Sequence, residues 1–338
     1  MPPKNGSATN GYQLPFEKPI LRLQRQIADL EEVQAEAGRD YSAEIRQLRN
    51  QYVSLLRKTY ANLSPWETVL VSRHPKRPQA LDYISTMVKG WVELHGDRRF
   101  SDDKAVRCGL GRIGTEKVAL IAQHKGRDTN EKIQCNFGCA HPEGYRKAMR
   151  VMKLAEKFHL PVVALMDTAG AYPGIGSEER GVAEAIAQSM MEMSRLRTPV
   201  VCVVIGEGGS GGAIGIGVGD RIAMMEFSYY SVISPEGCAA ILWRTGEKAP
   251  EAANALKLTA GYLHEFGVID DIIPEPLGGA HRSPTEAAAN LERYVVRSLR
   301  ELKSASPEHL LRHRYDRWRR LGQFVRTEQS QATESART

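Results

Sequence analysis

Apolar residues recur at helical spacing over two stretches near the N-terminus, the first of which begins at Glu17. The apolar positions are Ile20, Leu23, Ile27 and Leu30 in the first stretch and Ile45, Leu48, Tyr52 and Leu55 in the second. Spacings of three and four residues place each set on one face of a helix. The break at 38–41, with Ser42 as a helix cap, therefore predicts a helical hairpin. Its apolar faces must pack on the chain itself or on a partner chain.

Further along, continuous apolar runs alternate with amphipathic stretches. The apolar runs predict strands at residues 118–122, 161–167, 199–205 and 221–225. The amphipathic stretches predict helices at residues 81–94, 144–158, 177–196, 283–302 and 307–321, and Ser64-Pro65 has the form of a further helix start. Continuous apolar strands separated by helices indicate β-α-β units with both faces of the sheet covered. The pattern therefore predicts an α/β fold.

These elements divide the chain into four parts. Residues 1–15 are expected to be disordered, and residues 16–78 form a helical arm followed by a linker with two prolines. The main α/β domain is expected over residues 79–304. A basic helix and tail complete the chain over residues 305–338.

Composition and charge narrow the class of protein. The chain has 338 residues, of which 42% are hydrophobic and 25% charged, as in ordinary globular proteins. No apolar run is long enough to span a bilayer, and the first ten residues lack the apolar region of a secretory signal. We therefore expect a cytoplasmic protein with no membrane partner.

The net charge is +6, with arginines concentrated near the C-terminus at Arg312, Arg314, Arg317, Arg319 and Arg320. No nucleic-acid-binding motif accompanies them, so a solvated basic face is favoured over a nucleic-acid partner. A basic face can also meet an acidic protein or a CoA phosphate.

The five cysteines are scattered and odd in number, which is typical of a reducing compartment. They are Cys108, Cys135, Cys139, Cys202 and Cys238. No spacing among them matches a zinc ribbon, so we expect free thiols and no metal on this chain.

A glycine run at 206–213 follows the predicted strand 199–205 directly. It contains G-x-G-x-x-G, from Gly206, Gly208 and Gly211, and Glu226 lies at about the distance of a ribose-binding acid. A dinucleotide site is nevertheless disfavoured, because the next segment carries three more glycines and makes a poor helix. The next strand also follows too soon for the usual helical crossover.

The same run contains G-x-S-x-G, from Gly208, Ser210 and Gly212. This pattern would make Ser210 the nucleophile of a serine hydrolase, with Asp270 and His281 as its partners. Nothing in the sequence ties His281 to Ser210, so this alternative is weak.

A third interpretation uses only the backbone of the run. Glycines at a helix start expose unpaired N–H groups at the positive end of the helix dipole. Together, these groups and the dipole can stabilise a developing oxyanion. Glycine also lets a ligand approach the backbone closely. A tight turn with a purely structural role stays open beside it.

A set of short motifs then narrows the choice through its order and spacing. The motifs are FEKP (16–19), RHP (73–75), RP (77–78), ELHGDR (93–98), HKGRDT (124–129), EGYRK (143–147), DTAGAYPG (167–174), GEGGSGGA (206–213), SPEG (234–237) and PEPLGGAH (274–281). Together they resemble the carboxyltransferase alpha subunit of bacterial and plastid multi-subunit acetyl-CoA carboxylase. The resemblance covers residues 16 to about 284.

The resemblance implies a crotonase-like spiral fold of the ClpP/crotonase superfamily, carrying the N-terminal helical hairpin. It implies a transferase that is active only with a beta subunit, in an assembly of two alpha and two beta chains. The beta chain of this family carries the zinc ribbon. The implied reaction moves a carboxyl group from carboxybiotin, held on the biotin carboxyl carrier protein, to acetyl-CoA. Its product is malonyl-CoA for fatty acid synthesis, and biotin carboxylase belongs to the larger complex.

The resemblance also implies the site residues. The amides of Gly211 and Gly212 match the family's oxyanion hole for biotin, whose anion can itself take the proton of the acetyl methyl group. Further positions are expected to contact substrate: Gly170, Ala171, Tyr172, Gly174, Gly208, Gly209, Lys125 and Arg127. Lys125 and Arg127 would meet CoA phosphates or the biotin carboxylate, or form a solvated loop, whereas His124 is expected to be a hydrogen-bonded structural histidine. The chain departs from the family at Ala169, where proline is usual, and at Cys139, where methionine is usual.

Overall fold

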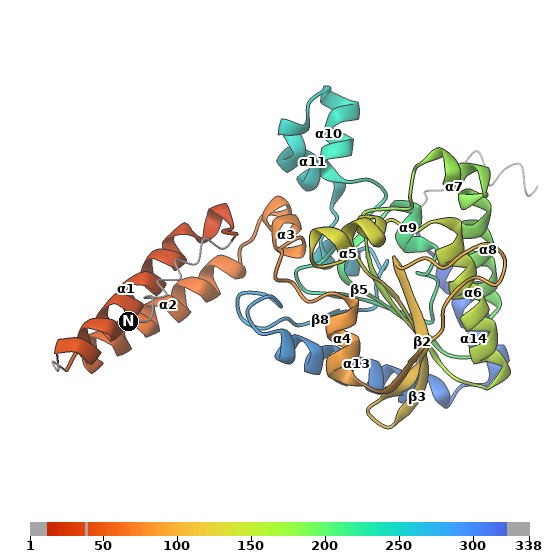
Figure 1. Cartoon of the computed structure of the whole chain (residues 1–338), viewed down its shortest axis with the longest axis horizontal. Coiled ribbons are helices and arrows are strands. Elements are labelled where there is room, and N and C mark those ends of the chain that lie inside the picture. The colour runs from red at the N-terminus through yellow and green to blue at the C-terminus, as the bar shows by residue number, and fades with distance from the viewer. Residues whose placement is uncertain (1–11, 38–39, 323–338) are drawn as a thin grey trace, which may run out of the picture.

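An eight-stranded sheet forms the centre of the structure, a computed structural model that describes residues 12–37 and 40–322 (Figure 1). Seven strands follow one another across it: β1 (Val88–Glu93), β2 (Val106–Ile113), β3 (Glu116–Gln123), β4 (Val162–Thr168), β5 (Val200–Gly209), β6 (Arg221–Met225) and β8 (Asp271–Ile273). The short β7 (Tyr229–Ser231) pairs with the last residues of β5. The β1–β3 pairs are antiparallel, and every pair from β3 onward is parallel.

Helices cover both faces of this sheet. On one face pack α6 (Pro142–Lys157), α8 (Val182–Arg195), α12 (Ala260–Glu265) and α14 (Pro307–Arg319), and on the other pack α4 (Ala80–Met87) and α13 (Pro284–Lys303). Along β4, Ala164 and Met166 contribute to the first core and Val163 and Leu165 to the second. Because side chains alternate along a strand, a strand that is apolar throughout feeds both cores.

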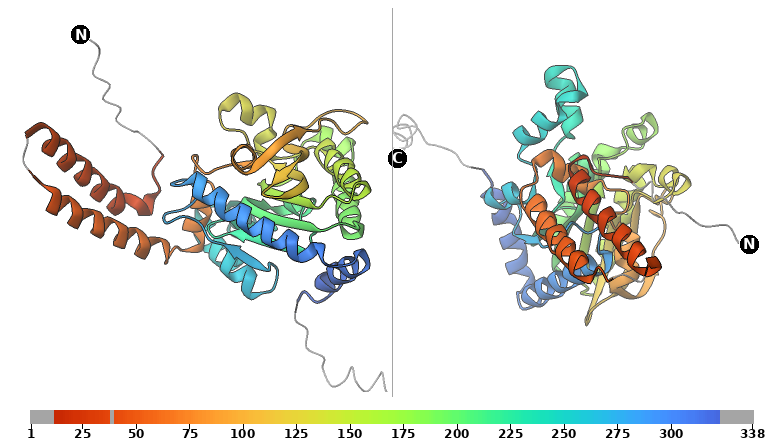
Figure 2. Two further views of the ribbon diagram at one scale, coloured as in Figure 1. Left: turned by 90° about the horizontal axis from the view of Figure 1, so that it is seen from below. Right: turned by 90° about the vertical axis from the view of Figure 1, so that its left-hand side faces the viewer.

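The α1 (Lys18–Ala37) and α2 (Ser42–Tyr60) helices form the predicted hairpin, which projects from the body (Figures 1 and 2). A separate core joins its base to the body, with Ile20 and Tyr60 from the hairpin packing beside Phe227. The predicted cap of α2 is wrong by one residue: Ser42 is the first helical residue, and Tyr41 occupies the cap position without a side-chain hydrogen bond. Asp40 Oδ1 instead accepts a hydrogen bond from the Ser42 amide at 2.9 Å.

Helix α3 (Pro65–Ser72) begins as predicted. Ser64 Oγ accepts from the Glu67 amide, and Glu67 Oε2 accepts from the Ser64 amide at 2.8 Å, which completes a capping box.

The remaining short elements are η1 (Pro15–Glu17), α5 (Thr129–Gln134), η2 (Asn136–Gly138), α7 (Ile175–Glu179), α9 (Ser210–Ile214), α10 (Pro235–Trp243), η3 (Gly246–Lys248) and α11 (Ala249–Leu256). Helices α10 and α11 rise away from the sheet (Figure 1).

Two helix predictions are corrected in part. The helix expected over 81–94 ends at Met87, and the rest of that stretch is the edge strand β1. The helix expected over 177–196 is divided at Gly181, whose φ of 76° is left-handed, so that α7 and α8 are separate. The strand β2 was not expected at all.

The basic C-terminal segment is also corrected in part. Arg314 is fully buried and donates to both carboxylate oxygens of Asp220, at 2.9 and 2.7 Å. Arg317 pairs with Asp270 at 2.5 Å. These two arginines attach α14 to the sheet domain, while Arg312, Arg319 and Arg320 are exposed.

The division into four parts stays a prediction. The disorder expected for residues 1–15 falls largely on residues outside those described, although Leu14 is fully buried. Most of the C-terminal tail, residues 323–338, also lies outside them. Within the described ranges, no helix is both long and apolar enough to cross a membrane.

Candidate functional site

Two loops that follow neighbouring parallel strands form the candidate site. β4 and β5 lie side by side, with Thr168 opposite Gly208, so the segment after Thr168 meets the turn that begins α9. This is the carboxyl edge of the parallel strands, where α/β proteins place their ligands. The register therefore brings segments 167–174 and 206–213, each of which contains predicted site residues, to the same edge of the sheet.

Glycines in the turn are required by the closeness of the two backbones. A Cβ on Gly209 would lie 2.2 Å from the Ala169 carbonyl oxygen, and one on Gly212 would lie 2.4 Å from the Gly170 carbonyl carbon. Side chains at either position would force the two loops apart. Gly211 differs, because the nearest atom to its Cβ position is Ile186 Cδ1 at 3.6 Å, an ordinary contact distance.

The turn leaves backbone amides available at the start of α9. Gly209 precedes the helix and offers no side chain to cap it. The Gly215 amide donates to the Gly211 carbonyl at 3.1 Å, which fixes the peptide between Gly211 and Gly212. In a helix the amide of that peptide points opposite to its carbonyl, toward the helix start, where the first four amides have no partner within the helix.

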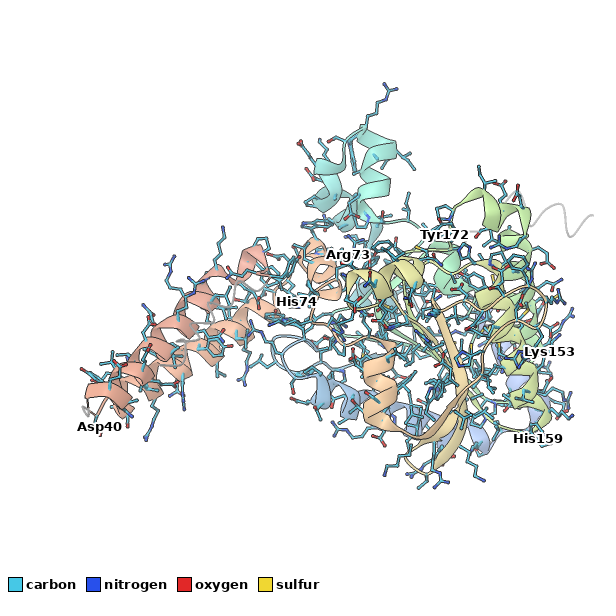
Figure 3. The ribbon with its side chains drawn as sticks, viewed as in Figure 1. Asp40, Arg73, His74, Lys153, His159 and Tyr172 are labelled. Atoms are coloured by element: carbon cyan, nitrogen blue, oxygen red, sulfur yellow. The ribbon has the colours of Figure 1, made fainter. Side chains whose placement is uncertain are left out.

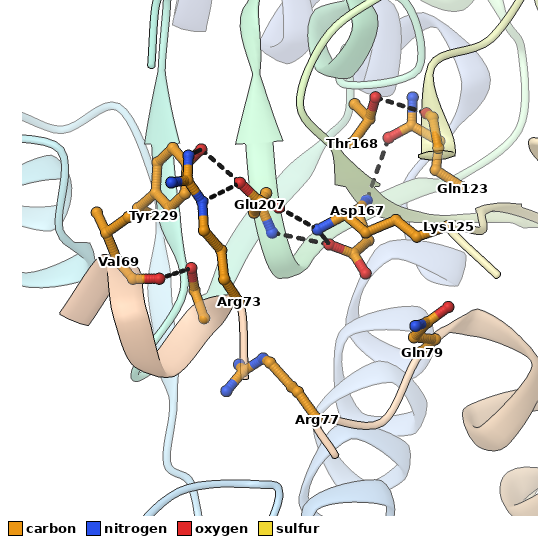
Figure 4. Close-up of polar contacts among 12 residues, drawn as sticks. Val69, Arg73, Arg77, Gln79, Gln123, Lys125, Asp167, Thr168, Glu207 and Tyr229 are labelled. Atoms are coloured by element: carbon orange, nitrogen blue, oxygen red, sulfur yellow. Dashed lines mark hydrogen bonds and ion pairs between the residues drawn. The ribbon is translucent and has the colours of Figure 1, made fainter. Parts of the chain in front are cut away.

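Gln123, the last residue of β3, connects the two loops. Its Nε2 donates to the Gly212 carbonyl at 2.7 Å. Its Oε1 accepts from the Asp167 amide at 3.1 Å (Figure 4). The side chain is fully buried. Sequence reasoning missed this residue, although a buried amide at the end of an apolar strand was a visible signal.

A buried network of charges lies at the ends of β4 and β5 (Figure 4). Glu207 accepts from Arg73 Nε at 2.6 Å, from the Tyr229 hydroxyl at 2.7 Å and from Lys125 Nζ. Lys125 Nζ also lies 2.7 Å from Asp167 Oδ1. Burial favours the neutral acid, yet the charges of Lys125 and Arg73 lower the pKa of the Glu207 carboxyl to about 2. The carboxylate is therefore charged at neutral pH.

Arg73 extends the same network to the protruding helix α10. Its Nη1 donates to Glu236 Oε1 at 2.5 Å, and its Nη2 donates to the Tyr229 hydroxyl at 2.9 Å. Figure 3 places Arg73 between the helical arm, α10 and the sheet. Residues 73–78 were expected to be a linker, so the contacts of Arg73 with Glu207 and Glu236 were not predicted. The two arginines beside prolines in the quoted motifs were the available signal.

The two cations predicted to meet substrate anions are paired within the chain. Lys125 lies between Asp167 and Glu207, with its side chain 17% exposed. Arg127 pairs with Asp82. His124 Nε2 lies 2.9 Å from Glu131 Oε1, in agreement with a structural histidine. Contact of Lys125 or Arg127 with a substrate anion stays a prediction.

The loop after β4 is held by backbone and ring contacts. The Tyr172 amide donates to the Ala140 carbonyl at 3.0 Å, and the Tyr172 ring lies 4.3 Å from the ring of His141. A Cβ on Gly174 would lie 2.4 Å from the Tyr172 ring, so glycine is required beside it. Ala171 pairs with Ala140 in an isolated bridge, and Gly170 packs against the α9 turn.

A pocket of about 290 Å³ opens beside the turn. Ser210 and Gly211 lie at its wall, and its other lining residues are Ile214, Tyr230, Ser231, Val232, Leu263 and Val268. Its lining is mostly apolar, with Ser210 and Ser231 among the lining residues. Such a pocket suits a ligand with apolar surface and a small number of polar groups.

The serine hydrolase and dinucleotide alternatives for the glycine run find no support. Ser210 has the left-handed φ of 52° expected at a strand-to-helix nucleophile turn, but its proposed partners lie elsewhere. Asp270 pairs with Arg317, and His281 stacks on His74 at 4.0 Å. For the dinucleotide alternative, Glu226 accepts from the Glu275 amide of its own chain at 3.0 Å.

All five cysteines are free thiols. Among the described residues, no group of three or more His, Cys, Asp and Glu side chains is arranged to hold a metal ion.

Comparison with known proteins places this geometry in a family. A family model described as acetyl co-enzyme A carboxylase carboxyltransferase-like matches residues 13–322. The chain belongs to this family. It is 52% identical over 315 residues to the protein of Rhodopirellula baltica named acetyl-coenzyme A carboxylase carboxyl transferase subunit alpha, covering 93% of this chain and 98% of that one. The protein of the same name from Thermus thermophilus is 52% identical over 312 residues, covering 92% and 99%.

Among solved structures, the chain is similar to transcarboxylase 12S with methylmalonyl-coenzyme A and methylmalonic acid bound, with a TM-score of 0.56 and 16% identity. The match covers 75% of this chain and 44% of that one, so the chain spans less than half of that neighbour. Such a likeness shows the fold, and the predicted crotonase-like carboxyltransferase fold is confirmed.

Proposed function

We propose that this chain is the alpha component of an acetyl-CoA carboxyltransferase and transfers a carboxyl group from carboxybiotin to acetyl-CoA together with a beta chain. Nearly full-length similarity to alpha subunits supports the activity. The observation that carries the site assignment is the close contact of two glycine-containing backbones beside the apolar pocket. We place biotin, delivered by its carrier protein, in that pocket. Biotin carboxylase is proposed to belong to the larger complex, which we place in the cytoplasm or plastid stroma.

The lining of the pocket fits the biotin group. Ile214, Val232 and Leu263 offer apolar surface for its hydrocarbon parts, and Gly211 places the start of the α9 turn in the pocket wall. The carrier-bound group supplies the carboxyl to be transferred and an oxygen on which negative charge develops. In this proposal the amides of Gly211 and Gly212 donate to that oxygen, and a fixed donor needs no reorganisation as the charge forms.

The neighbouring residues have supporting roles in this proposal. Gly170, Ala171 and Tyr172 form the wall that faces the turn, and Gly174 makes room for the Tyr172 ring. Gly209 lets the chain at Ala169 approach closely, and Gly208 makes room for the Tyr230 ring. Lys125 holds the Asp167 and Glu207 carboxylates, and Arg127, whose side chain is 42% exposed, is the better placed of the two to meet a CoA phosphate.

Activity should require the assembled enzyme. The test uses the full chain, purified alone and mixed with its beta chain, and follows labelled carboxyl from the carboxylated carrier protein into malonyl-CoA. Transfer is expected only from the mixture. Full transfer by the isolated chain would contradict a shared site.

The oxyanion role is tested by Gly212→Ala in the assembled enzyme. The added Cβ must push the turn away from Gly170, so kcat should fall by about 10²-fold as one donor is displaced. Gly261→Ala is the matched control, because no atom lies within 4 Å of its Cβ position. Size-exclusion chromatography checks assembly on the same preparation. Normal turnover by assembled Gly212→Ala enzyme would remove the oxyanion role.

A further inference from the structure

We propose that Gln123 is a positioning residue that holds the Gly211–Gly212 turn in the orientation the reaction needs. The inference rests on the function proposed for that turn. Gln123 ends β3, which lies next to β4, and β4 lies next to β5. Its side chain therefore reaches across the end of β4 to the turn after β5.

The side chain makes two hydrogen bonds that link separate segments. Nε2 donates to the Gly212 carbonyl at 2.7 Å, and Oε1 accepts from the Asp167 amide at 3.1 Å. Because the side chain is fully buried, water cannot replace either partner. Loss of one bond would leave a buried polar group unpaired, which is unfavourable because that group has no water to bond instead.

These bonds matter most because the turn consists of glycines. Glycine has the widest backbone freedom of any residue, so its peptide planes are not held by side-chain packing. The Gly215 amide fixes the carbonyl of Gly211, and Gln123 fixes the carbonyl of Gly212. Two consecutive peptides are thereby oriented from outside the pocket. The Tyr145 hydroxyl also donates to the Gly212 carbonyl, at the longer distance of 3.4 Å.

Gln123 is not among the residues that line the pocket, so its effect passes through the backbone of the turn. Gln123→Met keeps a similar shape and removes both hydrogen bonds. In the assembled enzyme, kcat is expected to fall about tenfold or more, equivalent to losing one such buried bond, with KM for acetyl-CoA within about twofold. Hydrogen–deuterium exchange of residues 206–214 should become about tenfold faster, and this readout does not depend on turnover.

Thr198→Val is the matched control for a lost buried hydrogen bond. The Thr198 hydroxyl donates to the Leu160 carbonyl at 2.8 Å, just before β5 starts, at the end of the strand remote from the turn. This variant should lose stability without faster exchange at 206–214 and without a change in kcat. A merely structural role for Gln123 would make the two variants alike.

Gln123→Glu supplies a second, pH-dependent readout. A buried carboxyl has a raised pKa, and its protonated form can still donate to the Gly212 carbonyl, whereas the carboxylate repels it. The kcat of the variant relative to the parent should therefore rise about fivefold or more between pH 8.5 and pH 6. Asp167, Lys125 and Tyr145 face the same region, and division by the parent profile removes their shared titration.

The outcomes separate this inference from the proposed function. Loss of kcat in Gly212→Ala with normal kcat and normal exchange in Gln123→Met would overturn the positioning role alone. Normal kcat in both variants would overturn the oxyanion function of the turn as well. A flat pH ratio for Gln123→Glu would also contradict the donor role of Gln123.

Discussion

Arg73 Nε donates to Glu207 Oε2 at 2.6 Å, so a residue just after α3 holds a carboxylate near the end of β5, 134 positions later in the chain. Both side chains are largely removed from water, with 26% and 9% exposed. Charges in such a position depend on each other, because neither recovers its hydration when the partner is lost.

Arg73→Leu is therefore expected to lower the free energy of unfolding by about 3 kcal/mol. Arg49→Leu is the control: Arg49 pairs with Glu31 at a similar 2.7 Å, but the side chains are 65% and 43% exposed. An exposed pair contributes about 0.5 kcal/mol or less. Urea unfolding of both variants measures the difference, and equal losses would show that burial of the Arg73 pair has no special weight.

Acid should weaken the junction between the arm and the body. Burial lowers the pKa of the His281 imidazole from its ordinary 6.5 to about 3, and the cations nearby add to the shift. The unfolded chain then binds a proton below pH 6.5 that the folded chain refuses until about pH 3, so stability falls as the pH drops through this window. At pH 5 the loss reaches up to about 2 kcal/mol.

His281→Phe should remove this acid sensitivity, because it keeps a ring against His74 and has no proton to bind. Thermal unfolding of parent and variant between pH 7.5 and pH 5 gives the comparison. Parallel pH dependences would rule out His281 as the titrating group.

Helix α14 should depend on one of its arginines far more than on its neighbour. Arg314→Met leaves the buried Asp220 without its cation, and a loss of about 3–5 kcal/mol is expected. Arg312→Met changes an exposed side chain on the same helix and should cost about 0.5 kcal/mol or less. Similar unfolding midpoints for the two variants would contradict the anchoring role of Arg314.

Ser210 should prove dispensable as a nucleophile. Its hydroxyl has neither Asp270 nor His281 beside it, so Ser210→Ala should retain most carboxyl transfer, and a fluorophosphonate probe should leave the chain unlabelled. Because φ at this position is 52°, Ser210→Gly should stabilise the fold by up to about 1 kcal/mol. Strong labelling together with abolished activity in Ser210→Ala would reopen the hydrolase alternative.

The local pattern of apolar residues was sufficient to predict the buried strands. Strands β4 and β5 are apolar at consecutive positions, and a glycine or a charged residue marks their ends. It failed at β2, where Gly109 and Gly111 interrupt the apolar pattern. A Cβ on Gly109 would lie 2.5 Å from the Trp91 ring, so glycine is there to admit a side chain from β1. The need for glycine at this position becomes visible only when the two strands are paired. The same pairing explains why residues 88–93 form a strand although the sequence predicted a helix there.

The site was predictable to the same extent. The facing loops follow from two strand ends, and the motifs of the resemblance name the glycines. The contacts of Gln123 and Glu207 were not predictable, because each joins segments far apart in sequence whose distance only the folded sheet sets. The pairing of Lys125 with two carboxylates has the same origin, since Asp167 and Glu207 meet only when β4 and β5 align.

The Arg314–Asp220 pair has a consequence for the order of events during synthesis. Asp220 precedes β6 and also accepts from the Val200 amide at the start of β5, while its cation arrives 94 residues later. Until residue 314 has been synthesised, the Asp220 carboxylate at this end of the sheet lacks the cation that compensates its burial. We therefore expect this end of the sheet to complete its packing only after α14 has left the ribosome.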